Sequence, residues 1–156
     1  MHILAADGNL LDATCIALIA ALQHFRRPDT SVEGEEVHVW DPREREPVKL
    51  SLLHMPLCVS LRYFQGVDEV VVDATGREER CSAGEVVVCA NRFGEVCHMA
   101  KYGGPSVDAV TMLGWAKIAV DKVKVISKMI TDKLAEDEKK RDVGDIIKEL
   151  SATNER

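Results

Sequence analysis

Hydrophobic and polar positions along the chain follow a helical pattern first, then alternate, and then become helical again. The run from Leu10 to Gln23 is rich in Ala, Leu and Ile on nearly every side, which predicts a helix buried on more than one face. The preceding Asp7-Gly8-Asn9 supplies turn and N-cap residues. Pro28-Asp29 ends the helical pattern, and the alternation from Val37 to Trp40 predicts a short strand.

The middle of the chain shows the period-2 alternation of strands. Apolar residues at every second position from Met55 to Tyr63 predict a strand with one buried face, and Glu69 to Val72 is its expected hairpin partner. A second hairpin is predicted from Glu85 to Ala90 and from Glu95 to Ala100, with Asn91 to Gly94 as its turn.

The last third of the chain returns to helical spacing. A helix is predicted to begin there, with Ser106 as its N-cap and Asp108 in its first turn. Residues 137–156 are predicted to form a polar helical or disordered tail, with a break at Gly144 before 146–150. The order of helix, strands and helix predicts the α+β class. The long amphipathic helix is predicted from apolar residues that recur at helical spacing, namely Val110, Leu113, Val120, Val123, Ile130 and Leu134.

Charge and cysteine usage narrow the function classes. The 20 basic and 26 acidic residues give a net charge of −6, so RNA contact requires a local basic patch or a basic partner. Five cysteines without a C-x-x-C spacing indicate reduced thiols inside a cell. The N-terminal residues do not follow the pattern of a secretory signal, and the apolar runs are too short to span a bilayer, so we expect no membrane partner.

The candidate chemistry lies in the acid-rich segment from Asp73 onward. The five histidines are scattered, so no zinc site is predicted. A carboxylate cluster could hold Mg²⁺, which prefers oxygen ligands, or it could be a solvated acidic loop paired with Arg77 and Arg80. The four carboxylates of this cluster are Asp73, Glu78, Glu79 and Glu85.

Two arginine pairs are candidates for contact with phosphate. The pair Arg26 and Arg27 follows the first helix, and we take it as the RNA-binding candidate. The pair Arg43 and Arg45 is expected to solvate a loop, because neighbouring Asp29, Glu44 and Glu46 cancel much of its field.

Several stretches between Ile3 and Leu134 together form a recognisable series. They are Asp7-Gly8-Asn9-Leu10-Leu11-Asp12-Ala13, His24-Phe25-Arg26-Arg27-Pro28-Asp29, Arg43-Glu44-Arg45-Glu46-Pro47, His54-Met55-Pro56-Leu57-Cys58-Val59-Ser60, and Val72-Asp73 with Arg77-Glu78-Glu79-Arg80. In order and spacing they resemble the RNase PH-like exosome ring subunits. The D-G-N-L-L-D-A motif is shared among the non-catalytic ring subunits, and the H-F-R-R-P-D run is more specific.

The resemblance implies a fold and an assembly. Residues 1–136 would be the C-terminal portion of an RNase PH-type domain of the ribosomal protein S5 domain 2-like fold, with a mixed or antiparallel sheet. An N-terminal half-domain would precede them in the family. Six such domains form a hexameric ring around an RNA channel, topped by RNA-binding cap subunits. The implied localisation is the nucleus, the nucleolus and the cytoplasm.

The resemblance also implies where an active site would lie. Active relatives hold inorganic phosphate with a small polar or Thr-Arg pair, and Leu10 and Leu11 occupy those positions here. Their two catalytic carboxylates fall on Glu79 and Glu85, each one methylene longer than Asp. The prediction is therefore a non-catalytic ring subunit of a phosphorolytic exoribonuclease family, with no cofactor. An active phosphate-dependent 3′-to-5′ exoribonuclease using these glutamates and Mg²⁺, and a free-standing interaction domain unrelated to RNA, remain alternatives.

Overall fold

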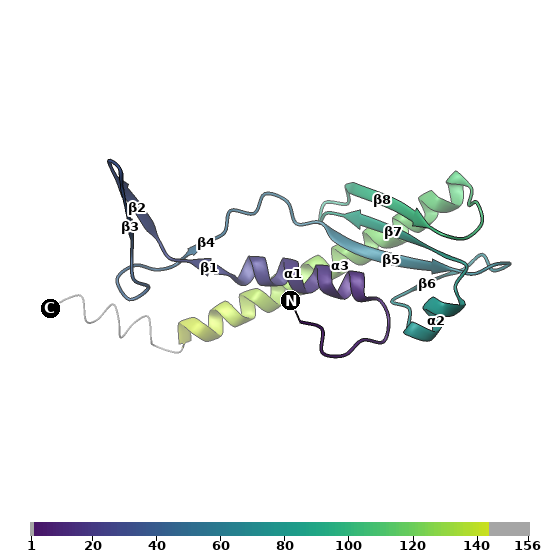
Figure 1. Cartoon of the computed structure of the whole chain (residues 1–156), viewed down its shortest axis with the longest axis horizontal. Coiled ribbons are helices and arrows are strands. Elements are labelled where there is room, and N and C mark those ends of the chain that lie inside the picture. Colours follow the sequence, from purple (N-terminus) through teal and green to yellow (C-terminus); the bar gives the residue numbers. More distant parts are fainter. Residues whose placement is uncertain (1, 144–156) are drawn as a thin grey trace. The chain divides into compact units, whose positions relative to one another are not determined.

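The computed structural model describes residues 2–143 (Figure 1). The chain divides into two compact units, which we describe separately. The first comprises the residues up to Ile19 and His54–Met129, and the second comprises Ala20–Leu53 and the residues from Ile130 onward. The elements in chain order are α1 (Leu10–His24), β1 (Arg26–Arg27), β2 (Thr30–Glu33), β3 (Glu36–Val39), β4 (Val48–Lys49), β5 (Leu57–Tyr63), β6 (Val70–Val72), α2 (Gly76–Cys81), β7 (Gly84–Ala90), β8 (Val96–Tyr102) and α3 (Ala109–Val143).

The first unit is built on a four-stranded antiparallel sheet in the order β6-β5-β7-β8 (Figure 1). Strand β5 pairs with β6 from Tyr63↔Val70 to Leu61↔Val72, and with β7 along its whole length. Strand β8 pairs with β7 across the turn at 91–94. Both predicted hairpins are confirmed, and so is the α+β class.

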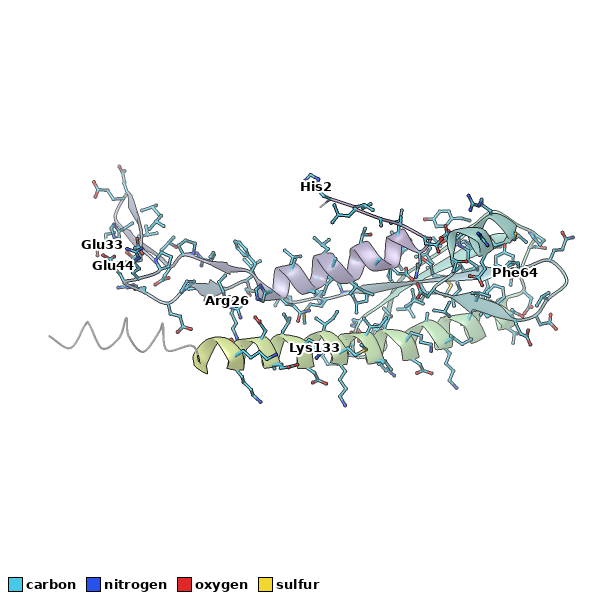
Figure 2. All side chains as sticks on the ribbon, turned by 90° about the horizontal axis from the view of Figure 1, so that it is seen from below. His2, Arg26, Glu33, Glu44, Phe64 and Lys133 are labelled. Carbon is cyan, nitrogen blue, oxygen red and sulfur yellow. The ribbon has the colours of Figure 1, made fainter. Side chains whose placement is uncertain are left out.

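The two faces of this sheet carry different side chains. The buried face of β5 packs against the first part of α3, where Tyr63 stacks on Trp115 with ring centroids 5.3 Å apart. The opposite face of the sheet meets the first part of α1 (Figure 2). Ser60 makes the contact there, because its N–H donates to Asp12 of α1. Side chains buried in the α3-facing core are Leu57, Val59, Leu61, Val86, Val88, Ala116, Ala119 and Val123.

Helix α1 is less buried than its composition suggested. Asp12 is its single buried residue, while Leu10, Leu11 and Leu18 are 43%, 48% and 57% exposed. The prediction of burial on more than one face is therefore wrong. The helix meets the sheet through one face, and residues 2–143 supply no second layer over its other side.

The acid-rich segment is not the expected loop, because Gly76–Cys81 forms the helix α2. Thr75 and Glu78 form a capping box: the Glu78 N–H donates to Thr75 Oγ1 (3.4 Å), and the Thr75 N–H donates to Glu78 Oε2 (2.7 Å). This last bond holds the pKa of Glu78 below its ordinary value. A helix of six residues is too short for apolar residues to recur at helical spacing. The capping residues Thr75 and Glu78 were therefore the sequence signal that could have predicted it.

Helix α3 confirms the long C-terminal helix but begins later than predicted. Asp108, not Ser106, caps it, because Asp108 Oδ1 accepts from the N–H groups of Val110 (2.8 Å) and Thr111 (3.0 Å). The helix reaches Val143, so the first part of the predicted tail is helical. The predicted break at Gly144 and the 146–150 segment lie outside the described residues.

The second unit contains two small ribbons, β1 with β4 and β2 with β3. The predicted strand at Val37–Trp40 corresponds to β3, and β2 was missed. Glu138 of α3 accepts from Lys49 (2.7 Å) and Arg26 (3.4 Å), which ties the β1–β4 ribbon to the helix. None of the helices described between residues 2 and 143 has the length and apolar content to cross a membrane.

Candidate functional site

The loop before α1 lies against the loop before α2. The Asn9 side-chain amide donates to Asp73 Oδ1 (2.9 Å), and the Gly76 N–H donates to the Asp7 carbonyl (3.0 Å). Gly8 has a φ of +92°, and a Cβ there would lie 2.3 Å from the carbonyl oxygen of Ala74. Only glycine permits both this backbone conformation and this close approach. The starts of α1 and α2 are thereby held together.

The N-terminus of α1 already has an anion from its own chain. The Asn9 N–H donates to Glu79 Oε1 at 2.9 Å, and the Asn9 carbonyl accepts the first helical bond from Ala13. Free amides at a helix N-terminus attract anions such as phosphate. Here a carboxylate on α2 takes that role.

Glu79 and Glu85, the two predicted catalytic positions, meet at one guanidinium. Arg62 Nη2 lies 3.3 Å from Glu79 Oε1 and 3.2 Å from Glu85 Oε2, and Arg62 is directly opposite Glu85 on the neighbouring strands. The three side chains are partly buried: Arg62 is 20% exposed, Glu79 is 29% exposed and Glu85 is 18% exposed. The cation between the two carboxylates is therefore a side chain of the protein.

The predicted phosphate positions offer no polar group. Leu10 and Leu11 follow the amide held by Glu79, and both are half-exposed. An apolar side chain cannot offset the charge of a phosphate. Within residues 2–143, no three His, Cys, Asp or Glu side chains are grouped so that they could hold a metal ion.

A buried carboxylate links α1 to the sheet at the edge of this site. Asp12 accepts from the Ser60 N–H (2.7 Å) and from Ser60 Oγ (2.8 Å). Strand β6 pairs with β5 only at 61–63, and at Ser60 the N–H turns to Asp12 instead. Burial raises the pKa of Asp12, and the two bonds from Ser60 oppose that shift.

Two half-buried thiols face each other on the sheet, and the structure does not activate Cys58 as a nucleophile. Cys58 and Cys89 are directly opposite each other on β5 and β7, with their Sγ atoms 3.0 Å apart. Burial raises the pKa of Cys58, which keeps the thiol protonated, whereas a reactive cysteine needs its thiolate.

The arginine pair after α1 is divided by the fold. Arg26 Nη1 donates to the carbonyls of Gln23 (2.9 Å), His24 (2.9 Å) and Phe25 (3.2 Å), and therefore caps the end of α1. Arg27 is exposed and donates to Thr30 Oγ1 (3.3 Å). RNA binding by this pair stays a prediction, with Arg27 the more available of the two.

Two residues of this site were missed from the sequence, Arg62 and Asp12. Arg62 had a weak signal, because it is the single charged residue of β5. Asp12 lies in the D-G-N-L-L-D-A motif, but helix composition alone gave no reason to place a buried carboxylate in an apolar run.

Comparisons with known proteins agree with this fold. The model of the 3′ exoribonuclease family, domain 2, matches residues 54–133. The chain is 44% identical to the human exosome complex component RRP45 over 144 residues, covering 92% of this chain and 33% of that protein. It is 44% identical to the Schizosaccharomyces pombe exosome complex component rrp45 over 142 residues, covering 91% and 49%. The chain thus spans a third to a half of the length of these relatives.

Solved structures show the same fold at low sequence identity. A subunit of the Archaeoglobus fulgidus exosome with RNA bound to the active site superposes with a TM-score of 0.60 at 22% identity, covering 81% of this chain and 45% of that one. Rice Rrp46 superposes with a TM-score of 0.57 at 14% identity, covering 85% and 51%. At these identities the likeness establishes the fold alone.

Proposed function

The chain belongs to the 3′ exoribonuclease family, domain 2, and from this we propose that it is a non-catalytic RNase PH-like subunit of the RNA exosome ring. In that role it supports assembly and the 3′-to-5′ processing and decay of RNA. The identity of 44% to exosome components over nine-tenths of the chain supports the assembly. The observation that carries the non-catalytic part is the guanidinium of Arg62 between Glu79 and Glu85.

Phosphorolysis needs a bound phosphate and a site that stabilises the charge developing on it. In this chain the amide at the start of α1 is taken by Glu79, and the next two side chains are Leu10 and Leu11. The carboxylate pair that would hold a metal is paired with the guanidinium of Arg62, which offsets one of its two negative charges. A lost phosphate partner at Leu10 and Leu11, together with the pairing of both carboxylates with Arg62, supports a site that does not catalyse phosphorolysis.

The proposed partners are other RNase PH-like subunits in a hexameric ring and the RNA-binding cap subunits. RNA would be guided by the complex jointly, because this chain has a net charge of −6 and cannot attract phosphate over its whole surface. The corresponding location is the nucleus, the nucleolus and the cytoplasm.

One observation favours a second function. Glu79 and Glu85, though six residues apart in sequence, do meet at one point. An active phosphate-dependent 3′-to-5′ exoribonuclease would use these two carboxylates to hold Mg²⁺ after Arg62 withdraws.

Release of nucleoside diphosphates from RNA by the purified complex, with phosphate and Mg²⁺, separates the two functions. Glu85→Gln removes the negative charge of one carboxylate with little change of shape, and Asp68→Asn is a matched control on an exposed loop. We expect equal rates from wild type and both variants. A rate that falls about 100-fold in Glu85→Gln alone would establish the second function instead.

A further inference from the structure

The β2–β3 ribbon has two chemically different faces. Strand register puts Val32 opposite Val37 and Thr30 opposite Val39. Since side chains alternate along a strand, these four residues share one face. The other face carries two further pairs, Ser31 opposite His38 and Glu33 opposite Glu36.

The polar face packs against Trp40, and on the apolar face Thr30 accepts from Arg27 at the base of the ribbon. The Trp40 indole N–H donates to Ser31 Oγ (3.0 Å), and the Trp40 ring lies edge-on to His38 with centroids 4.5 Å apart. The apolar face lies in solvent, with Val32, Val37 and Val39 exposed by 67%, 64% and 59%. A two-stranded ribbon is marginally stable in water, and burial of an apolar face is what stabilises it.

Charge at the tip of the ribbon limits what can cover this face. The turn at Gly34, whose φ is +66°, is flanked by Glu33, Glu35 and Glu36, and 30–39 contains no Lys or Arg. Strand register places Glu33 and Glu36 in the last pair before this turn. Three carboxylates repel a phosphate backbone, so RNA is a poor occupant. They complement a protein surface on which Lys or Arg borders an apolar strip.

The area of the face argues for an occupant that is also held elsewhere. Full burial of a valine is worth about 1.5–3 kcal/mol, which at about 25 cal/mol per Å² corresponds to about 60–120 Å² of apolar surface. Three valines exposed by about 60% therefore offer roughly 100–200 Å². A stable interface buries about 800 Å² per partner. The ribbon alone cannot hold a freely diffusing protein, but it can add to a contact between subunits of one assembly.

We propose that the apolar face of the β2–β3 ribbon docks on a neighbouring protein subunit of the same assembly, at an apolar strip bordered by Lys or Arg. This inference rests on the proposed function, since it requires that the chain be part of a multisubunit complex. It adds a surface and the chemistry of the partner surface to that function.

Photo-crosslinking in the assembled complex tests it directly. A benzophenone amino acid replaces Val37 on the apolar face of the full chain, and the matched control replaces His38 on the polar face. We expect the probe at Val37 to crosslink to another protein subunit, with a yield several-fold above that at His38. Crosslinks to RNA, equal yields at the two positions, or no crosslink at Val37 in an intact complex would overturn the inference.

A second measurement follows the dissociation of the chain from the purified complex. The double variant Val32→Thr with Val37→Thr keeps β-branched side chains, so the ribbon persists while its face becomes polar. We expect dissociation roughly tenfold faster, against no change for the control His38→Thr. An unchanged rate in a chain that still co-purifies with RNase PH-like subunits overturns the docking alone. Failure of the wild-type chain to co-purify with any of them overturns the proposed function as well.

Discussion

Replacement of Asp12 by Ala removes the carboxylate that joins α1 to the sheet. Asp12 and Ser60 are each 5% exposed, so both Ser60 donors would be left buried without an acceptor. A buried donor left without an acceptor costs about 1–3 kcal/mol, so the N–H and the hydroxyl of Ser60 together give about 2–6 kcal/mol. Removal of the buried carboxylate also removes its desolvation cost, which leaves a net loss of about 2–4 kcal/mol in the free energy of unfolding.

Urea unfolding of the purified chain, followed by circular dichroism, measures this loss. Asp68→Ala removes a carboxylate from an exposed loop and serves as the control, with an expected change within about 0.5 kcal/mol. A result for Asp12→Ala that is no larger than that for the control would refute the assignment of Asp12 as the link between α1 and β5.

The same site has a defined pH dependence. Because burial raises the pKa of Asp12, the folded state keeps the proton at pH values where the unfolded chain, with a pKa of about 3.9, has lost it. Wild type should therefore lose stability relative to Asp12→Asn as the pH rises from below about 4 through the raised pKa. A difference between the two proteins that does not change with pH, or that changes in the opposite direction, would show that burial does not dominate at Asp12.

Two further substitutions test the neighbouring contacts. Arg62→Met leaves Glu79 and Glu85 close together without a cation, and we expect it to lower the free energy of unfolding in urea by about 1–3 kcal/mol. Arg62→Lys keeps the positive charge and should lower it less. Equal stability of Arg62→Met and wild type would speak against the ion pairs. Gly8→Ala brings a Cβ to 2.3 Å from a backbone oxygen and should lower the free energy of unfolding by more than about 2 kcal/mol. The control is Gly34→Ala, where φ is also positive but the space is open, and its expected loss is about 1–2 kcal/mol. Equal losses would mean that the packing around Gly8 is unimportant.

Much of the sheet and the long helix could be predicted from the sequence, because their signals are local. Alternation in β5 marks a strand with one face against a core, and the helical spacing after Asp108 marks one face of α3. The length and apolar content of α1 predicted a helix correctly. They did not predict its burial, since that depends on how many layers surround it.

The candidate site was only half predictable. Matching to related sequences selected Glu79 and Glu85, but nothing in the spacing of the chain indicated that Arg62 lies between them. That contact depends on two features of the fold. The register of β5 against β7 places Arg62 opposite Glu85, and helix α2 places Glu79 beside Arg62. The capping box at Thr75 was a local signal for α2, and it shows that short helices are better sought by their caps than by their period.

The central claim, membership of an exosome-type ring, is tested most directly by purifying the chain from its own cells under native conditions. The mass of the native complex and the identity of its subunits are then measured by mass spectrometry. We predict a stable assembly that contains other RNase PH-like subunits, each present in the same copy number as this chain. Recovery of the chain as a free monomer, or only with proteins unrelated to RNA decay, would contradict the claim.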